Sequence, residues 1–170
     1  DRRWATLGPS MKSMKDNTSI PLIVLGLCWL TGAQAQEVLK LWAGEARPHY
    51  KENTLVEREE RVWGTVCVTH VTEPTLAIYR ARGKNTGIGV VIIPGGNYTV
   101  VAMHHEGHDV AKALSDRGVT AAVLKYRLPD PNSSDQPEKV PLVDARRALQ
   151  LLREQHVRLG LRPDKVGVLG

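Results

Sequence analysis

The stretch that decides the fold is residues 87–98, which read GIGVVIIPGGNY. Residues 88–93 are apolar and mostly β-branched, which is typical of a strand buried on both faces of a parallel sheet. Pro94 ends the strand, and the Gly-Gly-Asn sequence at residues 95–97 tolerates backbone angles that other residues avoid. Adjacent glycines also leave amides bare of side chains, and such amides stabilise a negative charge developing on oxygen. The stretch therefore predicts a buried strand and an anion-binding loop, although an ordinary strand-to-helix turn has the same signature.

The residues after this loop alternate between helical and strand patterns. Residues 106–117 place apolar residues at helical spacing and end before Gly118, which predicts a helix. Residues 119–126 predict a second buried strand, residues 140–159 a second helix, and residues 166–169 a third strand. This order indicates an α/β fold, in which a mostly parallel sheet has helices on both faces and binds ligands at the carboxyl ends of its strands.

Two further segments precede this unit. Residues 36–61 are polar and weakly periodic, and we interpret them as a lead-in to an α/β domain that occupies residues 62–170. Within the domain, residues 62–71 and 75–79 are strand-like and are separated by Glu-Pro. We expect these two strands to pair with each other as an antiparallel edge.

The N-terminal part of the sequence has the pattern of an export signal. Residues 1–13 show no usable pattern, and both Met11 and Met14 are candidate starts. Residues 14–35 combine a charged beginning, an apolar run and small residues up to Ala35, which predicts a signal peptide cleaved after Ala35. The apolar run is too short to span a bilayer. We therefore expect a secreted or periplasmic protein with no membrane attachment after cleavage.

Composition argues against two classes of protein. The formal net charge is +5, but the basic residues alternate with acidic ones, as in residues 57–61, and aromatic residues make up only 5% of the chain. Without a basic stripe and stacking aromatics, no nucleic-acid partner is expected. After residue 35 the only cysteine is Cys67, so the exported part has no internal disulfide. This fits an exported bacterial enzyme better than a small disulfide-stapled domain.

Three ligand-binding motifs fit the sequence poorly. A dinucleotide site needs its glycines after the first strand, whereas Gly87 and Gly89 come before it, and the Gly-Lys-Ser/Thr of a phosphate-binding P-loop is absent. Residues 104–108, HHEGH, approach the HExxH motif of zinc proteases, but the second histidine comes one residue too early. His104 and His108 have the right separation, yet the acid is then misplaced. No metal ligand or cofactor is expected, and a metal-dependent hydrolase is kept only as a lesser alternative.

Several motifs occur in the same order as in a known enzyme family. They are VIIPGGNY (91–98), HEG (105–107), DVA (109–111), VLKYRL (123–128), DARRA (144–148) and DKVGVLG (164–170). Together they resemble exported α/β-hydrolases of the esterase group that includes acetyl xylan esterase-like and feruloyl esterase-like enzymes. The resemblance runs from about residue 75 to residue 170.

The resemblance implies where the catalytic parts lie. In this family the strand matching residues 166–169 leads into a nucleophile elbow, G-x-S-x-G, and Gly170 matches its first glycine. The serine, followed by the acid and the histidine, is then expected beyond residue 170, so the chain is interpreted as an N-terminal fragment truncated after this strand and inactive alone. Gly95, Gly96 and Asn97 match the oxyanion-hole segment, where the family has a glycine in place of Asn97.

Three other side chains are candidates for the site. Tyr98 follows the oxyanion segment and is expected in the substrate pocket. Tyr126 is a second pocket candidate, for which packing and hydrogen bonding are the favoured role. Asp144 precedes the elbow, so we interpret it as the partner of a nearby arginine on its helix and not as the triad acid.

The sequence thus predicts a secreted serine esterase that acts on small acyl esters, with acetylated hemicellulose sugars as plausible substrates. A non-catalytic α/β module that uses the Gly-Gly loop to hold an anionic or sugar ligand is the main alternative.

Overall fold

Residues 37–170 are the part of the chain that the computed structural model describes, and the predicted export signal lies outside them. They form a five-stranded sheet with strand order β1-β4-β6-β5-β7 and a separate pair, β2-β3. The strands are β1 (Glu37–Lys40), β2 (Arg58–Val62), β3 (Thr65–Thr69), β4 (Thr75–Tyr79), β5 (Gly89–Ile92), β6 (Thr120–Lys125) and β7 (Val166–Leu169). The helices are η1 (Met103–His108), α1 (Asp109–Ser115), η2 (Pro137–Lys139), α2 (Val140–Glu154), α3 (His156–Leu159) and η3 (Pro163–Lys165).

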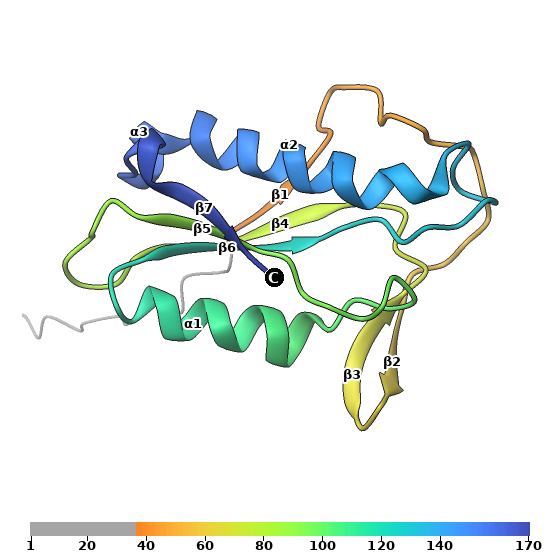
Figure 1. The fold of residues 1–170 in the computed structure, drawn as a ribbon, viewed down its shortest axis with the longest axis horizontal. Coiled ribbons are helices and arrows are strands. Elements are labelled where there is room, and N and C mark those ends of the chain that lie inside the picture. The colour runs from red at the N-terminus through yellow and green to blue at the C-terminus, as the bar shows by residue number, and fades with distance from the viewer. Residues whose placement is uncertain (1–36) are drawn as a thin grey trace, which may run out of the picture. The chain divides into compact units, whose positions relative to one another are not determined.

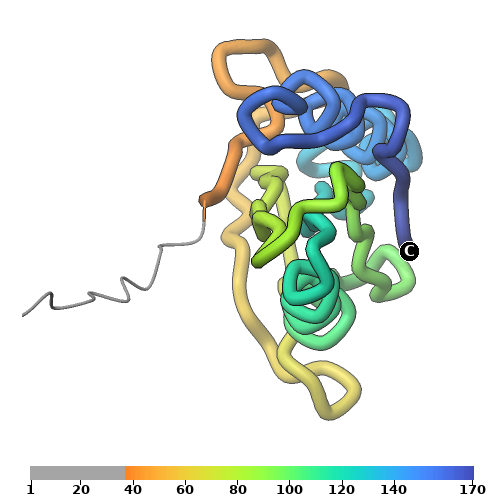
Figure 2. Tube along the Cα trace, turned by 90° about the vertical axis from the view of Figure 1, so that its left-hand side faces the viewer, coloured from red at the N-terminus to blue at the C-terminus, as the bar shows by residue number. Residues whose placement is uncertain are grey.

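The sheet is mixed, with β6 as its middle strand. β5 pairs in parallel with both β6 and β7, whereas β4 runs antiparallel to β6 and to β1. In Figure 1, α1 covers one face of the sheet and α2 the other, and Figure 2 shows the same layers from the end. The predicted α/β class, with helices on both faces, is confirmed.

Small side chains let the helices approach the middle of the sheet. Ala121 and Ala122 of β6 are fully buried, as are Ala111 of α1 and Ala148 of α2. Val91 of β5 is also fully buried, as predicted for a strand covered on both faces. Close packing of this kind is what allows two helical layers to sit on one sheet.

The predicted pairing of residues 62–71 with residues 75–79 is wrong. β3 pairs with β2 as a projecting hairpin, and β4 lies inside the main sheet between β1 and β6. Burial explains the difference, because the middle three residues of β4 are buried whereas four of the five residues of β2 are exposed. β1 and all of β2 except Val62 lie in residues 36–61, where the sequence suggested only a weakly periodic lead-in.

The helices differ from their predicted bounds at their ends. The first begins three residues before the predicted start, as the π-helical turn η1 that continues into α1. The second is divided at Gln155 into α2 and α3, and it stops at Gly160, whose φ of 63° ends the helix as predicted. None of the helices in residues 37–170 has the length and apolar character needed to cross a bilayer.

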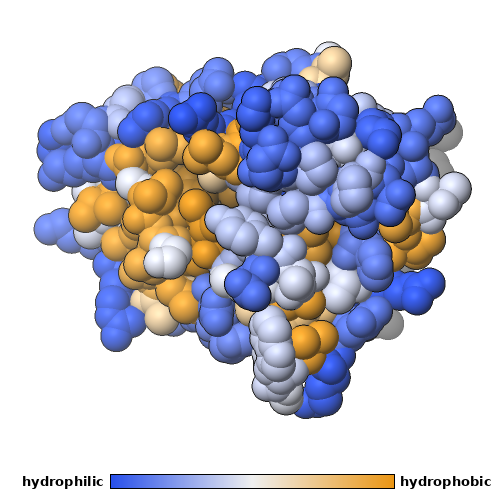
Figure 3. All heavy atoms as spheres, turned by 45° about the vertical axis from the view of Figure 1, so that its right-hand side comes forward, coloured by the Kyte–Doolittle hydropathy of each residue, from blue (hydrophilic) through white to orange (hydrophobic). Residues whose placement is uncertain are grey.

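One side of the described part is rich in apolar side chains. Val168 and Leu169 of the edge strand β7 are exposed, and Leu142 near the start of α2 is exposed as well. Figure 3 shows a broad hydrophobic area on the left of the view.

Candidate active site

The loop of residues 95–98 leaves the carboxyl end of β5 through Pro94, as the sequence predicts. Three consecutive residues have positive φ: 141° at Gly96, 52° at Asn97 and 59° at Tyr98. Asn97 therefore adopts the left-handed conformation that asparagine tolerates well. Tyrosine tolerates it poorly, at a cost of about 1–3 kcal/mol. Strain of this size persists only where the surrounding structure holds the backbone in place.

Backbone hydrogen bonds hold this loop closed. The carbonyl oxygen of Gly96 accepts the amides of Thr99 at 3.0 Å and Val100 at 3.2 Å, and that of Gly95 accepts the amide of Ala102 at 2.9 Å. A Cβ atom on Gly96 would lie 2.0 Å from the carbonyl oxygen of Val100. Only glycine fits at this position.

The β2–β3 hairpin braces the far end of the loop. Val68 of β3 and Val101 exchange two backbone hydrogen bonds of 2.9 and 2.8 Å. Beside them, the fully buried Cys67 packs in one small cluster with Val100 and Ala102. Burial raises the pKa of the Cys67 thiol, so this cysteine serves as a core residue.

The four amides of the loop divide into two kinds. The amide of Gly95 donates to Oε2 of Glu106 at 2.7 Å. Within residues 37–170, the amides of Gly96, Asn97 and Tyr98 donate to no protein acceptor. Consecutive unpaired amides on a glycine-rich turn are donors available to an oxygen anion. The oxyanion role of residues 95–97 itself stays a prediction.

A pocket of about 390 Å³ opens beside the loop. It is lined by Ile93, Pro94, Gly95, Gly96, Asn97, Tyr98, Tyr126, Pro141, Leu142, Ala145 and Gly170. Because β5 and β7 are parallel neighbours, the amide of Ile93 donates to the carbonyl oxygen of Leu169 at 2.8 Å. The residue after β7 therefore lies beside the start of the loop, and the pocket brings Gly170 together with the Gly-Gly segment.

The two candidate tyrosines line this pocket in different ways. Tyr126 is only 4% exposed, and its hydroxyl donates to the carbonyl oxygen of Pro94 at 3.0 Å. Burial, followed by the neighbouring Tyr98 and Glu106, raises the pKa of Tyr126 to about 12. Tyr98 is 62% exposed and meets Tyr126 edge-on, with ring centroids 6.4 Å apart. Tyr126 thus anchors the corner between β5 and the loop, and Tyr98 presents its ring to solvent.

Tyr98 also borders a second hollow, of about 250 Å³. Its wall includes polar side chains at Thr69, His70, Asp130 and Ser133. Sequence reasoning missed this hollow, because its residues come from four separate segments that only the fold brings together.

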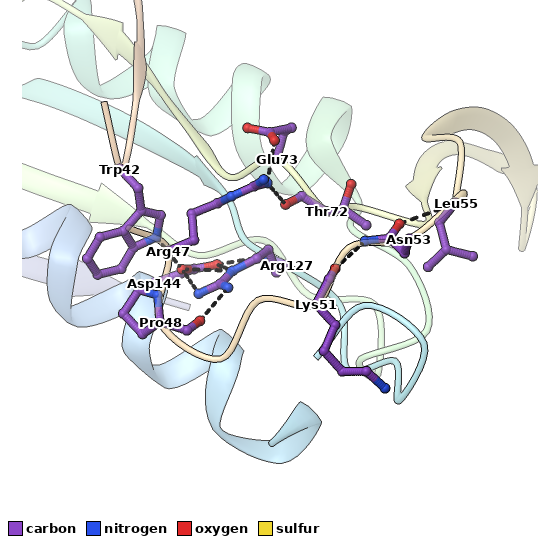
Figure 4. A network of polar contacts seen from close by, with 10 residues as sticks. All are labelled: Trp42, Arg47, Pro48, Lys51, Asn53, Leu55, Thr72, Glu73, Arg127 and Asp144. Atoms are coloured by element: carbon purple, nitrogen blue, oxygen red, sulfur yellow. Dashed lines mark hydrogen bonds and ion pairs between the residues drawn. The ribbon is translucent and has the colours of Figure 1, made fainter. Parts of the chain in front are cut away.

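A buried charged pair joins the segment that follows β6 to helix α2 (Figure 4). Arg127 donates from Nε to Oδ2 of Asp144 at 2.9 Å and from Nη2 to Oδ1 at 2.7 Å, and its backbone amide donates to Oδ2 at 3.0 Å. Trp42 Nε1 adds a bond to Oδ1 at 2.9 Å, and Arg127 Nη1 donates to the carbonyl oxygen of Pro48 at 2.8 Å. Both charged side chains are buried, and every donor named here is bonded.

The sequence was right that Asp144 pairs with an arginine but wrong about which one. The expected partner was on the same helix, whereas the observed partner, Arg127, follows β6 and lies 17 residues earlier. Asp144 is 0% exposed and faces the core, whereas Arg147 of α2 pairs with Glu45 instead.

The three histidines of residues 104–108 point to different partners. His105 Nδ1 bonds to Thr65 Oγ1 at 3.1 Å, and His108 Nδ1 bonds to the Tyr79 hydroxyl at 2.8 Å. His104 Nε2 lies 3.9 Å from a carboxylate oxygen of Glu59. In the described residues, no group of three or more His, Cys, Asp or Glu side chains is placed to hold a metal ion. Burial lowers the pKa of His108, and the nearby His104 lowers it further.

Comparison with known proteins links the chain to esterases. No protein-family model matches it. An acetylxylan esterase of Xylanibacter ruminicola is 27% identical over 85 residues, which are 50% of this chain and 17% of that protein.

Similar solved structures are also esterases and hydrolases. An acetyl ester-xyloside bifunctional hydrolase of Caldicellulosiruptor lactoaceticus is 35% identical with a TM-score of 0.49, over 58% of this chain and 34% of that one. An esterase of Thermogutta terrifontis is 16% identical with a TM-score of 0.48, over 73% of this chain and 40% of that one. The chain thus spans well under half the length of each of these proteins.

Proposed function

Because this chain resembles the α/β-hydrolase esterases in sequence and in its helix-covered sheet, we propose that it forms the oxyanion-hole half of a serine carboxylic-ester hydrolase. The loop of residues 95–97 supplies backbone donors to the substrate. The catalytic serine is expected two residues after Gly170, at the tip of the nucleophile elbow, and the acid and histidine follow it. We also propose that residues 14–35 direct export, on their sequence pattern alone.

One observation carries this proposal: Gly170 and the Gly-Gly loop line the same pocket. In an ester hydrolase the nucleophile must attack a carbonyl carbon whose oxygen sits on the oxyanion donors, so the two parts must lie within one substrate's width. Parallel pairing of β5 with β7 supplies this arrangement, because both strands end at the same edge of the sheet. A position of Gly170 far from the loop would have argued against it.

The chemistry proceeds by acyl transfer. The serine oxygen attacks the ester carbonyl, and the resulting tetrahedral oxyanion accepts hydrogen bonds from loop amides. Collapse expels the alcohol and leaves an acyl-serine, which water then hydrolyses to the acid and the free serine. Loss of one such donor costs about 3 kcal/mol of transition-state stabilisation, so the loop contributes a large part of the rate.

Two of the hollows that Tyr98 lines support small acyl esters of carbohydrates as substrates. The pocket next to Gly170 has apolar walls at Ile93, Leu142 and Ala145, which suit a short acyl group. Across Tyr98, the hollow lined by His70 and other polar side chains offers partners for sugar hydroxyls. Acetylated xylan, which the name of the matched acetylxylan esterase suggests, has both parts.

The direct test uses the longer gene product that continues past Gly170. It should hydrolyse p-nitrophenyl acetate and lose this activity after treatment with a serine-directed fluorophosphonate, whereas the 170-residue chain should be inactive. Hydrolysis by the 170-residue chain that the same reagent abolishes would contradict the proposal. A longer product that binds sugar or anions but never hydrolyses esters would favour a non-catalytic binding module.

A further inference from the structure

Glu106 bonds to the Gly-Gly loop but belongs to a different element, η1. Its Oε2 accepts the Gly95 amide at 2.7 Å, a charge-assisted bond at the short end of the normal range. We propose that Glu106 is a positioning residue, which fixes the loop by holding Gly95 and so leaves the amides of Gly96 and Asn97 as the oxyanion donors that this loop contributes. The part of this inference that concerns catalysis rests on the proposed esterase function.

The hydrogen bond between the Gly95 amide and the Glu106 carboxylate depends on the absence of a side chain at residue 95. A Cβ on Gly95 would lie 2.7 Å from Oε2, so any larger residue would push the carboxylate away. The approach is possible because the Ala102 amide bonds to the Gly95 carbonyl oxygen, so the π-helical turn η1, which starts at Met103, brings Glu106 back toward the loop. π-helical turns of this kind are rare and occur often at functional sites.

The carboxylate is itself held from the other side. Oε1 lies 3.4 Å from Nε2 of His105, and Nδ1 of the same ring bonds to Thr65 Oγ1 of β3 at 3.1 Å. A chain of contacts therefore runs from the β2–β3 hairpin through His105 and Glu106 to Gly95. The side chain of Glu106 is 48% exposed, so these contacts and not burial fix its position.

The Gly95 amide is a poor candidate for a third oxyanion donor. It already donates to a carboxylate, and an oxyanion placed on the same N–H would face the negative charge of Glu106 at hydrogen-bond distance. Like charges at this distance repel each other. The loop therefore offers its free amides further along the chain.

Two of those free amides are strengthened by bonds to the neighbouring carbonyl groups. The Gly95 carbonyl, which shares a peptide unit with the Gly96 amide, accepts the Ala102 amide at 2.9 Å. The Gly96 carbonyl, which shares a peptide unit with the Asn97 amide, accepts the amides of Thr99 and Val100. A peptide group that accepts hydrogen bonds at its oxygen becomes a better donor at its nitrogen. This polarisation singles out Gly96 and Asn97.

Amide NMR tests the contact without any catalysis. Pro94–Gly95 is the only Pro-Gly pair in the sequence and Gly95–Gly96 the only Gly-Gly pair, so selective labelling with ¹³C-carbonyl proline or glycine and ¹⁵N-glycine identifies both amides. In the 170-residue chain, Glu106→Ala should give the Gly95 proton the largest upfield shift of any glycine amide, and Glu106→Gln a smaller one. Glu52→Gln, a control at an exposed glutamate, should leave the amide proton shifts of Gly95 and Gly96 unchanged. An unmoved Gly95 proton in Glu106→Ala would overturn the proposal.

Kinetics of the longer gene product test the consequence. Glu106→Ala should lower kcat for p-nitrophenyl acetate about 10- to 100-fold with little change in KM, because the donors are misplaced only for the transition state. Glu106→Gln, which keeps an acceptor, should recover most of the loss. Equal rates for wild type and Glu106→Ala would contradict the positioning role. A wild-type product with no esterase activity would instead refute the proposed function, while the NMR result would still decide the Glu106–Gly95 contact.

Discussion

Two loops at the carboxyl ends of the neighbouring strands β5 and β6 treat their polar groups in opposite ways. The segment after β6 contains Arg127, whose guanidinium and amide are bonded to the buried Asp144. The loop after β5, at residues 95–98, is strained and keeps three amides without a protein acceptor among residues 37–170. Polar groups in a structural region are paired, because leaving them unpaired is costly. Where strain and free donors occur together, a ligand is the natural partner.

The first prediction concerns the paired loop, and it has the largest expected effect. Asp144→Ala leaves Arg127 buried without its counter-charge, which should lower the free energy of unfolding by about 3–5 kcal/mol in urea denaturation. Asp116→Ala, which removes the exposed pair with Arg82, should change it by less than about 1 kcal/mol. Equal losses of stability in the two variants would show that the Arg127–Asp144 pair has no special structural role.

The second prediction concerns the strained loop. Gly96→Ala places a Cβ 2.0 Å from a backbone oxygen at a φ of 141°, so it should cost about 2–4 kcal/mol and distort the loop. Gly167→Ala is the matched control, since a Cβ there meets nothing within 4 Å, and it should be close to neutral. Urea denaturation of both variants checks this. Tolerance of Gly96→Ala would mean that the loop is mobile and not held in the observed conformation.

The third prediction concerns the link between strand and loop. Tyr126→Phe removes the hydrogen bond to Pro94, which should cost about 1–2 kcal/mol near neutral pH. The pKa of Tyr126 is raised from 10.0 to about 12, so its stabilisation is complete below pH 10 and is lost as the pH rises through about 12. The stability gap between wild type and Tyr126→Phe should therefore shrink across this range. A gap that stayed constant across this range would show that folding does not raise the pKa of this hydroxyl.

The fourth prediction has the smallest expected effect. Asn97→Gly introduces the glycine that the esterases resembled by this sequence have here. It relieves the strain of the left-handed backbone conformation, but it also raises the conformational entropy of the unfolded chain. The relief of strain and the gain in unfolded-state entropy nearly cancel, so the free energy of unfolding should change by less than about 1 kcal/mol in thermal or urea denaturation. A larger loss would reveal a structural role for the Asn97 side chain.

The sequence predicted local features well and long-range ones poorly. The strands of residues 75–79 and 166–169 and the tight turn after β5 follow from β-branched runs and glycines, and the structure confirms them. The partner of β4 could not be predicted, because strand pairing depends on which segments the whole chain brings together.

The same limit applies to the site. Residues 95–98 and Gly170 line one pocket because they follow parallel neighbouring strands, whereas their catalytic roles stay predictions. It missed the Glu106–Gly95 bond, because Glu106 appeared only at a helix start, in a possible metal motif and in the HEG motif of the resemblance, and none of these gave it a partner. A glutamate shortly after a Gly-Gly loop, at the start of the next helix, is the signal that could have indicated it.

The most direct test of the central claim replaces the serine expected two residues after Gly170 with alanine in the longer gene product. If the free amides of residues 96 and 97 bind the oxyanion of an ester attacked by that serine, p-nitrophenyl acetate hydrolysis should fall by several orders of magnitude while the fold is retained. Hydrolysis at the wild-type rate in that variant would contradict the account.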